Sequence, residues 1–202
     1  MPCETTLPVP HRCPWPVQYW LLNPLRRLVE PPARLLGPHV QPGMTVLEPG
    51  CGMGYFSLPL ARMVGPEGRV LCVDVEPRAV ERLIRRARRA GLADRVTARP
   101  CGPRDLGLAE QRGQVDLALV LHVLHEAEDL TGFVDQIHAL LRPQGRMLVV
   151  ESSGHVAAKP FEAMLARCED CGLRVVDRPR VRGRRAALLA RRCGPSGPSA
   201  SD

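Results

Sequence analysis

The stretch "MTVLEPGCGMGYFS" (residues 44–57) decides the fold of this chain. It begins with a short apolar run, reaches a carboxylate at Glu48 and then places Gly50, Gly52 and Gly54 at alternate positions. Glycine has no Cβ atom, so it lets a backbone turn sharply and come close to a ligand. A strand that ends in a glycine-rich turn and continues as a helix is a common ligand-binding device of open α/β sheets.

Apolar runs alternate with helical patterns along the rest of the chain. The expected strands cover residues 45–48, 69–74, 95–99, 115–121 and 146–151, and the expected helices cover residues 55–64, 77–90, 131–141 and 159–171. Several strands are Val/Leu runs without polar alternation, which is typical of parallel strands buried on both faces. Two further runs, 173–181 and 185–192, are joined by Arg182-Gly183-Arg184 and predict a hairpin. We therefore expect an α/β fold: a Rossmann-like, doubly wound, mostly parallel seven-stranded sheet with a C-terminal antiparallel hairpin.

Length and composition set the domain organisation. The 202 residues, of which 45% are hydrophobic, predict one globular domain over residues 41–193, preceded by an extension (1–40) and followed by a disordered tail (194–202). No apolar run is long enough to span a bilayer. The first residues lack the layout of a secretory signal, so a cytoplasmic location is expected.

The net charge of +7 raises the question of nucleic-acid binding. All of the 28 basic residues except Lys159 are arginine, in a chain that is also rich in Ala, Gly and Pro. This pattern indicates genomic base composition rather than selection for phosphate contacts. In the arginine-rich helix 78–91, Val80, Leu83 and Ala87 predict a buried face, which leaves its arginines on a solvated face. The composition therefore argues against a nucleic-acid partner.

The eight cysteines do not form a disulfide framework or a zinc pattern. Only Cys168 and Cys171 have a CxxC spacing, and no second pair completes a zinc site. Cys168 shares a helical face with Phe161 and Leu165, which favours core packing, and Gly172 is a natural end for that helix.

Two acidic residues indicate the chemistry of the ligand. Glu48 stands just before the glycines, where a carboxylate suits a ligand with a positive charge rather than a pyrophosphate. Asp74 ends the second strand, in "VLCVDVEP", where an acid can accept both hydroxyls of an adenosine ribose. Glu76, followed by Pro77 as the first helical residue, fits a helix N-cap better than Asp74 does.

With these motifs the chain resembles the class I S-adenosylmethionine-dependent methyltransferases, of the small-molecule, ubiquinone/menaquinone-biosynthesis-like type. The resemblance covers roughly residues 40–192 and rests on "VLEPGCGMGYFS", "VLCVDVEP", "VDLALVLHVLHE", "LLRPQGRMLVVE" and the terminal hairpin. It implies S-adenosyl-L-methionine as cofactor, a small-molecule methyl acceptor and no metal. A homodimer is left open.

The resemblance also implies roles for particular residues. Those expected to bind the cofactor are Glu48, Gly50, Cys51, Gly52, Gly54, Asp74, Val75, Cys101, Gly102, Leu121 and His122. Among them, Glu48 and the glycines would hold the methionine part, Asp74 the ribose and Val75 the adenine. Gly102 stands where the family usually has an aspartate for the adenine amino group, so backbone groups near Cys101 would replace that contact.

Residues with acid–base chemistry follow the fourth and fifth strands. His125, Glu126 and His155 are the expected catalytic residues, with Glu151 nearby. A general base is needed only if the acceptor arrives protonated. Two alternatives are that this loop only closes over the cofactor, or that these four residues bind a metal.

Other functions remain as alternatives: an RNA or protein methyltransferase, a nicotinamide-dependent oxidoreductase, or a cofactor-binding protein without catalysis. The strand-four sequence "LHVLHE" differs from the N-P-P-Y type used on planar nitrogens, and the G-x-G-x-G spacing disfavours a nicotinamide site. Both tryptophans and Tyr19 lie in the extension. We expect this segment to be a lid in which Trp15 and Tyr19, with His11 and Cys13, face the acceptor.

Overall fold

The structure, a computed structural model, describes residues 30–192. The expected lid residues His11, Cys13, Trp15 and Tyr19 and the expected tail 194–202 lie outside this range.

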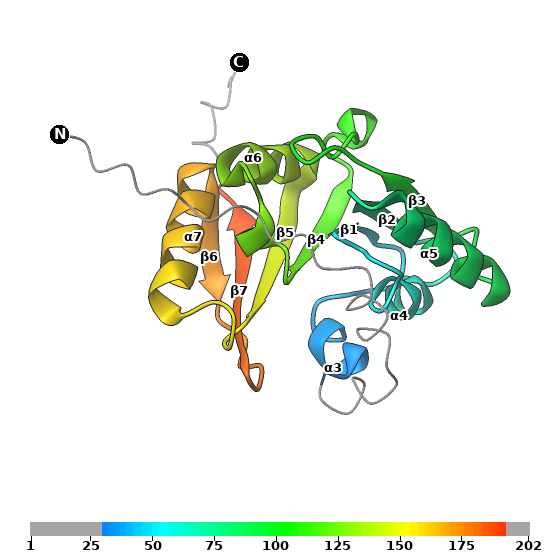
Figure 1. Cartoon of the computed structure of the whole chain (residues 1–202), viewed down its shortest axis with the longest axis horizontal. Helices are drawn as coiled ribbons and strands as arrows, with labels where there is room; N and C mark the ends of the chain where they lie inside the picture. The colour runs from blue at the N-terminus through cyan, green and yellow to red at the C-terminus, as the bar shows by residue number, and fades with distance from the viewer. Residues whose placement is uncertain (1–29, 193–202) are drawn as a thin grey trace, which may run out of the picture.

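A seven-stranded sheet with the order β3-β2-β1-β4-β5-β7-β6 forms the centre of the described chain (Figure 1). β1 to β5 pair with one another in parallel, and β7 runs antiparallel to both β5 and β6, between which it lies. The predicted fold class is therefore confirmed. The strands are β1 (Thr45–Pro49), β2 (Arg69–Asp74), β3 (Val96–Pro100), β4 (Val115–Leu121), β5 (Leu141–Ser152), β6 (Leu173–Asp177) and β7 (Arg184–Arg191).

Helices cover both faces of this sheet. They are α3 (Pro32–Leu36), α4 (Ser57–Met63), α5 (Pro77–Arg89), α6 (Leu130–Leu140) and α7 (Ala158–Asp170), with two short 3₁₀ turns at Ala109–Gln111 and Leu124–Glu126. Apolar residues of α3, α4 and α5 pack in one buried cluster, and those of α6 and α7 pack in another. Figure 1 shows α4 and α5 beside β1 to β3, and α7 beside β6 and β7. None of the helices within residues 30–192 has the length and apolarity needed to cross a bilayer.

Several predicted element ends need correction. α6 begins after Asp129, whose side chain accepts the Gly132 N–H, so the prediction of Thr131 as N-cap was wrong. Glu76 does cap α5, and Pro77 is its first residue, as predicted.

β5 begins at Leu141 rather than at Arg146. The backbone becomes extended as soon as α6 ends, and Leu141 is fully buried opposite Val115. Arg146 then pairs with Leu117, so the intervening residues 142–145 bulge out of the ladder. At the C-terminal hairpin, β6 ends earlier than predicted, at Asp177, and leaves a longer connection to β7.

The pairing between β1 and β4 positions the site. Their register contains two pairs, Val46 with Leu117 and Leu47 with Ala118, whereas β1 pairs with β2 at five positions. β1 connects onward to β2 on one side, and β4 connects to β5 on the other. In open α/β sheets such a reversal of strand order leaves a crevice at the carboxyl ends of the strands.

Candidate active site

A cavity of about 500 Å³ lies at the carboxyl ends of β1, β2, β4 and β5. Of the residues predicted to bind cofactor or to catalyse, all except Gly54 line it: Glu48, Gly50, Cys51, Gly52, Asp74, Val75, Cys101, Gly102, Leu121, His122, His125, Glu126 and His155. The cavity therefore joins residues that are far apart in the sequence.

The three glycines of the loop after β1 differ in their surroundings. All have positive φ angles: 69° at Gly50, 51° at Gly52 and 82° at Gly54. A Cβ atom at Gly50 would collide with Val123, and one at Gly54 would collide with Leu83 of α5. A Cβ at Gly52 would meet nothing within 4 Å. Gly50 and Gly54 thus let the loop pack against the protein, while Gly52 leaves open space beside the cavity.

Glu48 is buried at the end of β1, with 3% of its surface exposed. Ser57 Oγ donates a hydrogen bond to Glu48 Oε2 at 2.5 Å, and the Cys72 thiol donates to the same oxygen at 3.8 Å. Burial raises the pKa of Glu48 to about 7, although both hydrogen bonds oppose the change. A cation in the cavity would favour the ionised carboxylate.

Asp74 both supports the glycine loop and lines the cavity. Its Oδ2 accepts the Gly52 N–H at 2.7 Å, and its Oδ1 accepts the Glu76 N–H at 2.9 Å. Burial raises the pKa of Asp74, and these two backbone hydrogen bonds lower it. Next to it, Val75 is 45% exposed and offers an apolar surface at the cavity wall.

The loop after β3 closes the side of the cavity near Val75. The Cys101 N–H donates to the Asp74 carbonyl, and the Gly102 N–H donates to the Asp105 carbonyl, each at 2.9 Å. Burial raises the pKa of Cys101 to about 11, so its thiol stays protonated at neutral pH. Asp105 also lines the cavity, which sequence reasoning missed. Its carboxylate accepts the Gly107 N–H. Asp105 lies three residues beyond Gly102, the position at which the family pattern has an aspartate.

An imidazole–carboxylate pair lies at the ends of β4 and β5. His125 Nδ1 is 2.8 Å from Glu151 Oε2, and the His125 N–H donates to Glu151 Oε1 at 3.3 Å. Glu151 is fully buried, and its hydrogen bond raises the pKa of His125 against the opposing effect of burial. With Nδ1 held by a carboxylate, Nε2 is the nitrogen left to exchange a proton with a ligand.

The other two predicted catalytic residues lie close to His125. Glu126 Oε1 is 4.0 Å from His125 Nε2, and burial raises the pKa of Glu126. The rings of His125 and His155 have centroids 6.5 Å apart. No group of three or more potential metal ligands occurs among residues 30–192.

Glu30 was not predicted as a site residue. It is 4% exposed, and its Oε1 lies 2.9 Å from His122 Nε2 and 3.2 Å from Arg184 Nε. The Tyr55 hydroxyl donates to its backbone carbonyl. His122 has a φ of 59°, which is unusual for a residue with a side chain. Because Glu30 precedes His122 by 92 positions and Arg184 by 154, no local sequence pattern could have joined them.

Arg86 corrects the prediction of a uniformly solvated arginine face on α5. Its guanidinium donates to the backbone carbonyl of Met53, inside the glycine loop. Arg88 and Arg89 are exposed, as predicted. One arginine of this helix therefore supports the cavity wall.

The residues of the cavity fit S-adenosylmethionine. The buried Glu48 and the partly buried Asp74 both line the cavity, where two carboxylates suit a cationic ligand that also carries ribose hydroxyls. Gly52 leaves room for close approach, and Val75 presents an apolar surface for a flat ring.

Comparison with known proteins agrees with this fit. A model of the methyltransferase domain matches residues 40–178. Over 107 residues the chain is 35% identical to the ubiquinone biosynthesis O-methyltransferase of Methylocella silvestris, covering 52% of this chain and 38% of that protein. Over 158 residues it is 33% identical to the ribosomal protein L11 methyltransferase of Pelotomaculum thermopropionicum, covering 78% of this chain and 47% of that protein. Shorter matches reach 23S rRNA methyltransferases of Acinetobacter baumannii.

Among solved structures, the fold matches a SAM-dependent methyltransferase from Aquifex aeolicus. The TM-score is 0.76 at 23% identity, with 88% of this chain and 99% of that chain covered.

Fold and cavity together define the class of Rossmann-like methyltransferases that use S-adenosylmethionine as cofactor. The chain belongs to the methyltransferase domain family, which confirms the resemblance seen in its motifs. It spans less than half the length of the two curated relatives described above.

Proposed function

We propose that this chain transfers the methyl group of S-adenosylmethionine to a small-molecule acceptor that arrives protonated, such as a hydroxyl compound. The pairing of His125 with Glu151 at the cavity, at 2.8 Å, carries this proposal. The likeness to ubiquinone biosynthesis O-methyltransferases supports an acceptor of this kind.

Glu48, Asp74 and the glycine loop bind and orient the cofactor in this proposal. The bound cofactor supplies an activated methyl group on a sulfonium. His125 Nε2 accepts the proton of the acceptor hydroxyl, and the Glu151 carboxylate stabilises the resulting imidazolium. Glu126 and His155 line the same part of the cavity, where they can orient the acceptor. Leu121 and Phe133 give this wall apolar surface that helps to exclude water.

Replacing His125 tests the proposed base. His125→Gln should lower turnover by roughly 100-fold or more, while cofactor affinity measured by calorimetry changes little. The Glu151 hydrogen bond raises the pKa of His125, so turnover should rise with pH through a value above the usual 6.5. The variant should lose that rise.

His39→Gln is the matched control, since His39 does not line the cavity, and it should keep both rate and pH profile. If His125→Gln turns over its acceptor at the normal rate, His125 is not the base.

A methyl-donor consumption assay separates the small-molecule proposal from its rivals. Phenols and quinols, thiols, carboxylates, total RNA and ribosomal protein would each be offered as acceptor. A ribosomal protein is the named substrate of the relative covering 78% of this chain, so it is the rival to test first. Consumption with protein or RNA alone would overturn the proposal. The homodimer and the cytoplasmic location stay predictions.

A further inference from the structure

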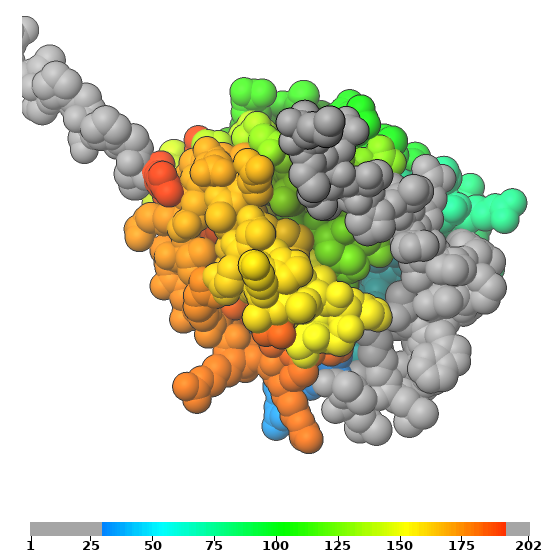
Figure 2. All heavy atoms as spheres, turned by 60° about the vertical axis from the view of Figure 1, so that its left-hand side comes forward, coloured from blue at the N-terminus to red at the C-terminus, as the bar shows by residue number. Residues whose placement is uncertain are grey.

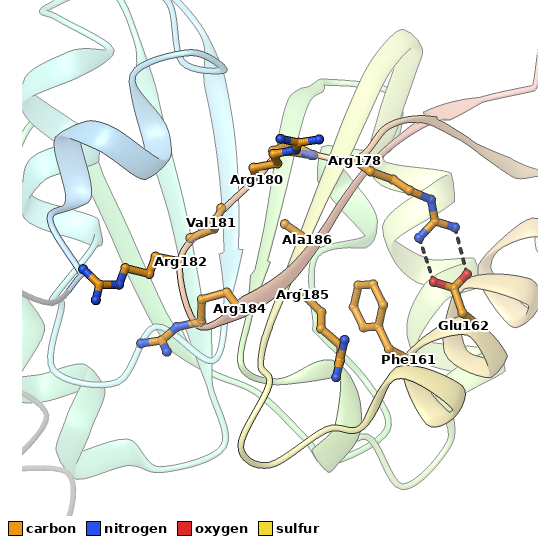
Figure 3. Close-up of a pocket in the computed structure, with 10 residues that line it drawn as sticks. Phe161, Glu162, Arg178, Arg180, Val181, Arg182, Arg184, Arg185 and Ala186 are labelled. Carbon is orange, nitrogen blue, oxygen red and sulfur yellow. Dashed lines mark hydrogen bonds and ion pairs between the residues drawn. The ribbon is translucent and has the colours of Figure 1, made fainter.

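A second cavity, of about 550 Å³, lies between the start of α7 and the segment that joins β6 to β7 (Figure 3). We call it the arginine cleft. Its lining residues are Phe161, Glu162, Arg178, Pro179, Arg180, Val181, Arg182, Arg184, Arg185 and Ala186. Five arginines against one glutamate leave a formal excess of four positive charges. Figure 2 shows the β6–β7 segment (orange) projecting from the molecule next to α7.

Two of these arginines have carboxylate partners. Arg178 forms a two-pronged pair with Glu162, with distances of 2.7 and 2.8 Å (Figure 3), and Arg184 bonds to Glu30. Arg185 Nε donates to the Val156 carbonyl at 2.9 Å, which fixes its guanidinium, and its charge also acts on the nearby Glu162 carboxylate.

The remaining two arginines, Arg180 and Arg182, form no ion pair or hydrogen bond within the described chain. Both are exposed, so their long side chains can rotate toward an anion held at Arg185.

The apolar surface at the base of the arginine cleft strengthens the interactions of its charges. Phe161, which lines the cleft beside Arg185 (Figure 3), is 2% exposed. Arg185 is half-buried against this apolar surface, where charges interact more strongly than in water. A bound anion would reduce the electrostatic repulsion among the arginines of this cleft. Arg88 and Arg89 on α5, by contrast, are exposed.

The arginine cleft lies beside the acceptor end of the active site. Arg184 lines both cavities. In the β5–β7 ladder, Arg185 stands opposite Glu151, the partner of His125, and Arg184 stands opposite Ser152. An acceptor at His125 could therefore reach the cleft across one strand.

We infer that the arginine cleft binds an anionic group of the methyl acceptor, a phosphate or a carboxylate, with Arg185 as its fixed contact. Guanidinium groups bind both anions through paired N–H donors, so the cleft would select acceptors that carry such a group. This inference rests on the proposed function and adds the chemical class of its substrate.

The test uses inorganic phosphate and the full chain labelled with ¹⁵N. Arginine Nε–H signals would be followed by NMR while phosphate replaces chloride at constant ionic strength, with acetate as a second arm. We expect a saturable shift at Arg185. Arg180→Gln with Arg185→Gln should weaken phosphate binding at least tenfold. Stronger binding of phosphate than of acetate would assign a phosphate-bearing acceptor, and the reverse a carboxylate.

Arg88→Gln with Arg89→Gln removes the same charge from α5 and should leave phosphate binding unchanged. His125→Gln should also leave phosphate binding unchanged, which separates this test from that of the proposed function. Equal shifts at all arginines, or equal loss in the α5 control, would overturn the inference. So would a single-stranded RNA that binds at Arg185 at least 100-fold more tightly than phosphate, because the cleft would then be an RNA contact.

Discussion

Glu48 lies at the end of β1 with its carboxyl group buried and bonded to Ser57 and Cys72. Its pKa is raised from 4.5 to about 7, so the folded state holds this proton more tightly than the unfolded state. The stability contributed by the protonated group is complete below about pH 4.5 and is lost as the pH rises through about 7. The rise in the pKa of Glu48 corresponds to a loss of about 3 kcal/mol of folding stability between these two pH values.

Glu48→Gln should therefore remove this dependence of folding stability on pH. Free energies of unfolding of the cofactor-free protein, measured between pH 5 and 8, should fall with pH more steeply in the wild type than in Glu48→Gln. Parallel curves would show that the Glu48 carboxyl does not titrate in this range. The Gln variant keeps the size of the side chain, so the comparison isolates the charge.

At the scale of elements, α5 supports the glycine loop through Arg86 and the Met53 carbonyl. Arg86→Gln should weaken cofactor binding roughly tenfold, or about 1.5 kcal/mol, the size of a hydrogen bond from a charged group. Arg88→Gln, on the exposed face of the same helix, should leave affinity unchanged. Calorimetry with S-adenosylmethionine measures both variants, and equal affinities would mean that the loop does not need this support.

Element types could be predicted because their signals are local. Val/Leu runs such as residues 115–121 bury both faces of a strand, and Glu76-Pro77 starts a helix by its own backbone chemistry. Element ends depend on competition between neighbours. Asp129 and Thr131 both suit an N-cap, and the geometry of the turn favoured Asp129. The expected helix ended at residue 141 and the expected strand began at residue 146, whereas pairing with β4 draws Leu141 into the strand.

At the scale of the whole molecule, Glu30 connects the start of the described chain to β4 and β7 through His122 and Arg184. Glu30→Gln leaves a largely buried arginine without its carboxylate, so it should destabilise the fold by about 2–3 kcal/mol. Glu128→Gln removes the exposed partner of Arg104 and should cost less than about 1 kcal/mol. Chemical denaturation measures both, and similar small losses would show that the Glu30 contacts contribute little.

The candidate site divides in the same way between local and distant signals. Glu48, the glycines, Asp74 and His125 stand at strand ends, so the order of elements brings them to one edge of the sheet. Glu30 and the arginine cleft depend on how distant segments pack. In the sequence, Arg178 to Arg185 look like the other arginines of a basic chain, because nothing local shows that they surround one cavity.

The short pairing of β1 with β4 has a consequence for the kinetics of cofactor association. The ladder ends at Leu47 and Ala118, so a ligand entering between the two strand ends has no sheet hydrogen bonds to break. The barrier to entry then lies in the groups of the cavity wall, where Glu30 holds His122 and Arg184. Association rates should thus respond to changes at Glu30 more than to changes within the sheet.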